Sequence, residues 1–104
     1  MAPVAVSFVY PMGAKFDMEY YMKTHMPLVQ EKWSKYGLKS WKVAHYTNEE
    51  ATYCVQAWLE FDDLSQWGTA AASSEGTEIF DDVPNFTDAK PSTLVGVVTG
   101  GESW

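Results

Sequence analysis

The sequence predicts an α+β protein of the ferredoxin-like type, because four apolar, β-branched stretches and two helical patterns follow the order β-α-β-β-α-β. A length of 104 residues suits one domain, residues 1–104, with a modest core. Apolar residues make up 46% and aromatic residues 15% of the chain, far more than a disordered chain carries. We therefore expect a four-stranded antiparallel sheet with two helices on one face.

The first strand is expected over residues 4–10, where the side chains of a β-branched and aromatic stretch alternate between two faces. A helix should follow, from an N-cap at Asp17 to a stop at Gly37. Pro27 interrupts this helix, because proline has no amide hydrogen and disfavours helical angles at the preceding Met26. We expect the helix to kink or restart there.

The remaining elements complete the sheet and add the second helix. Asp62 and Asp63 are expected to cap this helix, whose apolar residues recur at helical spacing, and the Ser-Ser-Glu-Gly stretch at 73–76 should end it. A proline-bounded loop, VPNFTDAKP, precedes the last strand. The expected segments are strands at 38–46, 53–61 and 93–99, a polar hairpin loop at 47–52 and a turn at 77–82.

Both faces of the predicted sheet are apolar. In the third strand, for example, Val55, Ala57 and Leu59 alternate with Cys54 and Trp58. Two helices can cover one face only, and the other would expose a larger apolar patch than monomers commonly tolerate. A second copy of the same sheet is the simplest cover, so we expect a homodimer with its sheets packed face to face.

The charge of the chain is unevenly distributed. Residues 1–42 carry a net charge of +3, residues 43–104 carry −10, and there is no arginine. Such a field repels polyanions, so nucleic-acid binding is not expected. No run reaches the roughly 18 apolar residues that span a bilayer, the start has no basic leader, and Cys54 is the single cysteine. A cytoplasmic protein without a membrane partner is therefore expected.

His25 lies two residues before Pro27, on the helix face that is expected to meet the sheet. Two roles are open for it. It could be a core residue that donates one hydrogen bond, or a general acid or base whose pKa burial lowers. The hydroxyls of Tyr20, Tyr21 and Tyr46 could bind a carbonyl or phenol, or these rings could fill a half-buried layer.

Other catalytic patterns are missing from the sequence. His25 and His45 are the only histidines, and their spacing to carboxylates matches no metal site. There is no G-x-G-x-x-G motif and no recognisable serine or cysteine nucleophile pattern. We therefore expect neither a metal nor a cofactor, and we interpret the acids of the DDL and FDD stretches as helix-cap and surface charges.

Two segments, FDMEYYMKTHMPLV at 16–29 and DDVPNFTDAKP at 81–91, resemble the EthD family, named for a protein linked to the breakdown of ethyl tert-butyl ether. The resemblance runs from end to end and implies a dimeric α/β-barrel fold. It also implies that His25 is the active-site residue, that Tyr21 lies nearby and that residues 85–88 lie at the cleft mouth. Some fungal relatives are decarboxylases or dehydratases that need no cofactor, and small bacterial members often carry the label reductase. Related barrel families include oxygenases, cyclases, isomerases and haem-binding proteins.

Our leading hypothesis is a small cofactor-independent enzyme of lyase, cyclase or isomerase type. It would bind a flat, mostly apolar carbonyl or phenolic compound between helices and sheet, with His25 moving a proton. The alternatives are a non-catalytic dimer that binds a small hydrophobic metabolite, and an oxidoreductase or monooxygenase-like protein of the same superfamily. The expected substrate-binding residues are Tyr21, Tyr46, Trp41, Trp58, Trp67, Asn85 and Phe86.

Overall fold

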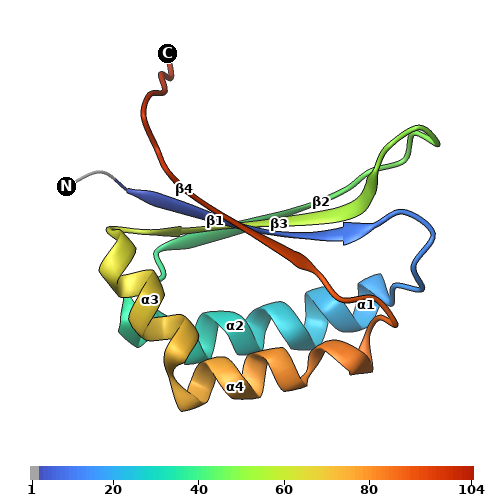
Figure 1. The fold of residues 1–104 in the computed structure, drawn as a ribbon, viewed down its shortest axis with the longest axis horizontal. Helices are drawn as coiled ribbons and strands as arrows, with labels where there is room; N and C mark the ends of the chain where they lie inside the picture. The colour runs from blue at the N-terminus through green and yellow to red at the C-terminus, as the bar shows by residue number, and fades with distance from the viewer. Residues whose placement is uncertain (1–2) are drawn as a thin grey trace.

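The computed structural model describes residues 3–104 and contains a four-stranded antiparallel sheet with the helices on one side of it (Figure 1). The sheet has the order β2-β3-β1-β4, so the ferredoxin-like α+β class is confirmed. Each strand begins and ends within about two residues of its expected bounds, because the period-2 pattern is strong in all four. The strands are β1 (Val4–Pro11), β2 (Ser40–His45), β3 (Tyr53–Phe61) and β4 (Ser92–Val97).

The first helical layer lies between β1 and β2 in the chain and consists of four helical segments that follow one another without a gap. Its N-cap is Asp17, whose carboxylate accepts a hydrogen bond from the backbone N–H of Tyr20 at 3.0 Å, as expected. It ends at Gly37, which adopts the left-handed conformation with φ 104° that a helix stop requires. The segments in between are α1 (Met18–Tyr20), the π-helical turn η1 (Tyr21–His25), α2 (Met26–Trp33) and the 3₁₀ turn η2 (Ser34–Tyr36).

The helix changes type next to Pro27, since the π-helical turn ends at His25 and α2 begins at Met26, but the expected departure of Met26 from helical angles is wrong. Met26 keeps helical angles, with φ −66° and ψ −38°, and the backbone stays helical through the proline. Pro27 lies in the first turn of α2, directly after the π-helical turn, at a position where proline's fixed φ suits the helix. The turn before it is wider instead, since the N–H of Met26 donates to the carbonyl of Tyr21, the i→i−5 pattern of a π-helix.

The second helical layer is longer than expected. α3 (Leu64–Ala72) is capped by Asp63, whose carboxylate accepts from the backbone N–H of Gln66 at 2.9 Å. Residues 73–76 do not end the helical structure, because the Ser73 hydroxyl accepts from the N–H of Gly76 at 3.0 Å and thereby caps a further helix. That helix is α4 (Ser74–Asp81), which continues into the 3₁₀ turn η3 (Val83–Asn85).

The core lies between the sheet and the two helical layers. Every second residue of β1 and β3 points into it, as the alternation predicted. Trp33 from α2 is fully buried and donates its indole N–H to the carbonyl of Ala70 in α3 at 3.0 Å, which ties the two layers together. None of the helices in residues 3–104 is long and apolar enough to cross a membrane.

The outer face of the sheet has no helix over it (Figure 1). It carries Trp58 and Tyr46, both half-buried, and Leu94, which is 52% exposed. The face is less apolar than expected, because polar side chains such as Lys42 and Gln56 also alternate onto it.

Candidate active site

His25 ends the π-helical turn and points into the space between helices and sheet. Its side chain is 5% exposed. The imidazole stacks on the ring of Tyr21, with 5.3 Å between ring centroids and an interplanar angle of 15°. It also packs on the ring of Phe86, with 4.5 Å between ring centroids. The wide turn therefore places the histidine among aromatic rings, with little contact with water.

Asp82, at the C-terminal end of α4, is the polar partner of His25. The distance from His25 Nδ1 to Asp82 Oδ2 is 2.9 Å. The other carboxylate oxygen accepts two hydrogen bonds, from the Tyr20 hydroxyl at 2.6 Å and from the Asn85 side-chain amide at 2.9 Å. These contacts join the two helical layers and hold the carboxylate in one orientation.

The electrostatics of the pair indicate which nitrogen of the His25 imidazole carries the proton. Burial lowers the pKa of His25 below its ordinary value, although the hydrogen bond to Asp82 and the charge of this carboxylate oppose the shift. Partial burial raises the pKa of Asp82, but hydrogen bonds from Tyr20, Asn85 and His25 outweigh burial and lower it overall. At neutral pH Asp82 is therefore an ionised acceptor, so the neutral imidazole carries its proton on Nδ1 and leaves Nε2 with a lone pair.

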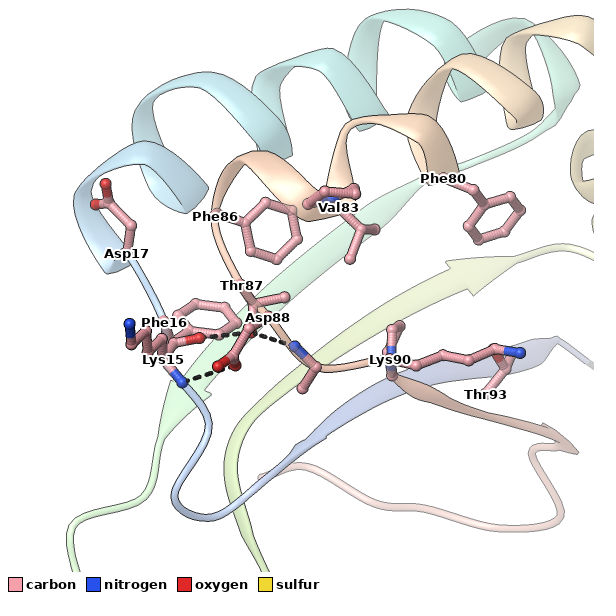
Figure 2. Close-up of a pocket in the computed structure, with 13 residues that line it drawn as sticks. Lys15, Phe16, Asp17, Phe80, Val83, Phe86, Thr87, Asp88, Lys90 and Thr93 are labelled. Carbon is pink, nitrogen blue, oxygen red and sulfur yellow. Dashed lines mark hydrogen bonds between the residues drawn. The ribbon is translucent and has the colours of Figure 1, made fainter.

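Two spaces lie near His25, and only the first of them borders its side chain. The first, bordered by His25 and the surrounding aromatic rings, has a volume of about 20 Å³, which holds about one water molecule. The second is an open cleft of about 1010 Å³ between the end of α4 and the start of β4. Phe80, Val83 and Pro91 border both spaces. Figure 2 shows Phe80, Val83 and Phe86 along the helical side of the cleft.

Three of the expected substrate-binding residues lie at the pair. Tyr21 and Phe86 are buried against the imidazole, and Asn85 reaches the pair through Asp82. Trp67 lies further along the core, packed on Trp33 with 5.4 Å between ring centroids. It does not border the space at His25.

The other expected aromatic residues lie elsewhere. Trp58 and Tyr46 are on the outer face of the sheet, where the Tyr46 hydroxyl donates to Gln56 at 2.8 Å. The expectation that they share the space at His25 is wrong, because successive strand residues point to opposite faces. Trp41 faces the helices but lies on the edge strand β2, where its indole N–H donates to the Gln30 side chain at 2.9 Å.

Asp82 was missed by the sequence analysis, which interpreted the acids of the FDD stretch as surface charges. Its side chain is only 13% exposed and it contacts a histidine 57 residues away. One signal in the sequence could have found it. An acid at the C-terminal end of a helix is unfavourable next to the negative end of the helix dipole, so it calls for a donor elsewhere in the fold.

Two other candidates lie away from the pair. His45 is exposed on the edge strand β2 and lies opposite Val55 in the sheet. Cys54 is buried on the outer face, where its thiol approaches the carbonyl of Pro11 at 3.3 Å. Within residues 3–104, no three side chains of His, Cys, Asp or Glu lie close enough to form a metal site.

No family model and no curated protein matches the sequence. Solved structures do match. An EthD-like protein from Ralstonia eutropha JMP134 is 24% identical, with a TM-score of 0.83 over 99% of this chain and 97% of its own. A dimeric protein of unknown function and ferredoxin-like fold from Bacteroides fragilis NCTC 9343 is 12% identical, with a TM-score of 0.59 over 92% and 95%. The hydroxynitrile lyase from Passiflora edulis is 8% identical, with a TM-score of 0.67 over 97% and 96%.

These likenesses show the fold. Over nearly its full length, the chain shares the ferredoxin-like fold of the EthD-like protein from Ralstonia eutropha. The ferredoxin-like fold that the sequence predicted is therefore confirmed for the single chain.

Proposed function

We propose that residues 1–104 form one EthD-like domain that acts as a small cofactor-independent enzyme of lyase, cyclase or isomerase type. Its substrate is a flat, mostly apolar carbonyl or phenolic compound, and His25 is the general acid and base. The observation that carries this proposal is the hydrogen bond between His25 Nδ1 and the ionised Asp82, beside an apolar space. A carboxylate that holds an imidazole in one tautomer is the arrangement that makes Nε2 a base.

The chemistry is a proton transfer. Nε2 takes a proton from a C–H or O–H group of the substrate, and the electron pair of that bond stays on the substrate. The imidazolium that forms is stabilised by Asp82, which Tyr20 and Asn85 hold in place. The proton then returns to another atom of the substrate or to a leaving group. The low pKa of His25 keeps the imidazole in its neutral, basic form at pH 7.

The substrate reaches the histidine from the open cleft. The space at His25 is too small for an aromatic ring, but it shares Phe80 with the cleft. Phe80 is 39% exposed, and its ring packs on Phe8 and Trp33 on the inner side. An outward rotation of this ring would join the two spaces while Tyr21 and Phe86 stay as walls.

We also propose that the protein works as a homodimer with its outer sheet faces in contact. Trp58, Tyr46 and Leu94 would then be covered, which accounts for apolar side chains on a face that no helix shields. The ferredoxin-like protein from Bacteroides fragilis is described as dimeric, which supports this assembly by analogy of fold.

A second candidate is a non-catalytic module that binds a small hydrophobic metabolite. The observation in its favour is that the open cleft, not the histidine, offers the volume. In this case the ligand would be recovered unchanged, and His25 would be a satisfied core residue.

A test uses hydrogen–deuterium exchange at the α-carbon of 2-tetralone, a flat aromatic ketone, followed by NMR in D₂O. Mandelonitrile serves as a second probe, because one protein of this fold is a hydroxynitrile lyase. We expect the purified protein to accelerate the exchange in 2-tetralone or the cleavage of mandelonitrile. His25→Gln should lower the accelerated rate by about 10²–10⁴-fold.

The control is His45→Gln, which changes the exposed histidine and should leave the rate unchanged. Equal rates for the wild type and folded His25→Gln would exclude His25 as the base. Binding of the probes without any turnover would favour the binding module.

A further inference from the structure

The open cleft is unusual in its charge. The chain has a net charge of −7, and residues 43–104 contain a single lysine, Lys90. This lysine lines the cleft, and so does Lys15 from the loop before α1. Two cations thus lie at an apolar cleft of an acidic protein.

The pairing of the lysines sets these two apart. Within the part of the chain that the structure describes, neither Lys15 nor Lys90 has a carboxylate within ion-pair distance of its ammonium group. The ammonium of Lys42 lies over the ring of Trp58 on the outer face. The lysines that do pair with acids are Lys23, Lys32, Lys35 and Lys39.

The two cleft lysines lie in different surroundings. In Figure 2, Lys15 is at one end of the cleft, close to Asp17 and Asp88. Asp88 accepts a hydrogen bond from the backbone N–H of Lys15 at 3.0 Å, so negative charge is already present there. An anion is therefore less favoured at the Lys15 end.

At the other end, Figure 2 shows the side chain of Lys90 extending past Thr93, with Phe80 above it. Thr93 pairs with Phe8 in the sheet, and Phe8 borders the space at His25. Thr93 is thus one strand away from a wall of the space at His25, and Lys90 and Thr93 line the cleft together with Phe80, which borders both spaces.

We propose that the substrate of this site is a flat aromatic carboxylate. Its carboxylate binds the Lys90 ammonium and the Thr93 hydroxyl, its ring packs on Phe80 and Val83, and its reactive end points toward His25. This inference rests on the proposed proton-transfer function and specifies its substrate class. It follows from charge complementarity, since the cleft offers at Lys90 a cation without a carboxylate partner beside apolar rings, whereas Asp88 lies at the Lys15 end.

The experiment compares 2-naphthoate with 2-acetonaphthone, which has the same shape without the charge, by ligand-observed NMR titration. We expect the wild type to bind the carboxylate about 10–150-fold more tightly, since a hydrogen bond to a charged group contributes this much. Lys90→Met keeps the apolar stem and should abolish the preference. The control is Lys23→Met, at an exposed lysine on the first helical layer, which should retain it.

Several outcomes would overturn the inference. They are equal binding of the two probes by the wild type, no binding of 2-naphthoate at millimolar concentration, and an unchanged preference in Lys90→Met. If Lys15→Met lost the preference for the carboxylate while Lys90→Met retained it, the placement of the ligand carboxylate at Lys90 would be overturned. If His25→Gln abolishes hydrogen–deuterium exchange at the α-carbon of 2-tetralone while the wild type shows no preference for the carboxylate, the proposed function stands and this inference falls.

Discussion

At the scale of single residues, the site depends on two groups that shift each other's titration. Burial alone would lower the pKa of His25 further, and the hydrogen bond and charge of Asp82 limit that fall. The imidazole is thereby neutral at pH 7 and still basic enough to accept a proton. Tyr20 and Asn85 contribute indirectly, because they bind the carboxylate oxygen that does not face the histidine.

Replacing Asp82 by asparagine tests this coupling. The amide has no charge, so the influence that raises the pKa of His25 is removed, and this pKa should fall further below its ordinary value. Because the neutral base is the active form, the acidic limb of the kcat/KM profile should move to lower pH. The plateau should fall by about 10-fold or more, since the imidazolium is no longer stabilised. A pH–rate profile of α-proton exchange measures both effects.

The matched control is Asp81→Asn, at the exposed acid directly before Asp82, which should leave the pH–rate profile unchanged. If Asp82→Asn moved neither the limb nor the plateau, the pair would have no role in the reaction.

At the scale of elements, the junction of α3 and α4 positions Asp82. Ser73 follows the last residue of α3 and caps α4, so the two helices meet without a linker. Gly76, in the first turn of α4, lies against the end of α3. A Cβ at this position would lie 2.7 Å from the carbonyl oxygen of Ala70. This close approach of backbone to backbone sets where α4 begins and thus where its C-terminal end places the carboxylate.

Alanine substitution at two helical glycines separates packing from helix propensity. Propensity alone predicts that Gly76→Ala and Gly68→Ala both stabilise by about 0.5–1 kcal/mol. At Gly68 no atom lies within 4 Å of the added Cβ, so this gain should be realised. At Gly76 the clash should reverse the sign and cost about 1–3 kcal/mol. Urea unfolding measures both changes, and equal stabilisation of the two variants would show that the contact is relaxed in solution.

At the scale of the whole molecule, the sheet is asymmetric. One face is covered by the helices over most of its area, and the other carries exposed or half-buried apolar side chains among polar ones. The strand β4 also lies at an edge of the sheet, with Val95 and Val97 exposed on its helix-facing side. Edge strands with exposed apolar residues are surfaces that proteins commonly cover.

The dimer is tested by Leu94→Lys, which places a charge on the outer face. We expect a shift from dimer to monomer in sedimentation velocity at micromolar concentration, because the charge would be buried in the interface. Leu64→Lys is the control. Its leucine is 56% exposed against 52% for Leu94, but it lies on α3, away from the outer face. A monomeric wild type, or a dimer that both variants retain, would contradict the assembly.

Much of the fold could be predicted because it is encoded within short windows. The bounds of β3 match the expected residues 53–61, since alternation over nine residues leaves one register. Asp17, Asp63 and Gly37 start and stop helices through contacts within three or four residues of themselves. α4 was missed because Ser-Ser-Glu-Gly is typical of a loop as well as of a helix start.

The site could be predicted only in part. By itself, the sequence determined the order of strands and helices along the chain, the inward direction of His25 and the aromatic nature of its surroundings, because periodicity gives the type of each element and assigns each side chain to a face. The tertiary structure alone decided that Asp82 meets His25 across 57 residues, that Trp58 and Tyr46 lie on the far face, and that Lys90 borders the cleft. These contacts join segments that no local pattern links, and they are set by how the helices pack on the sheet.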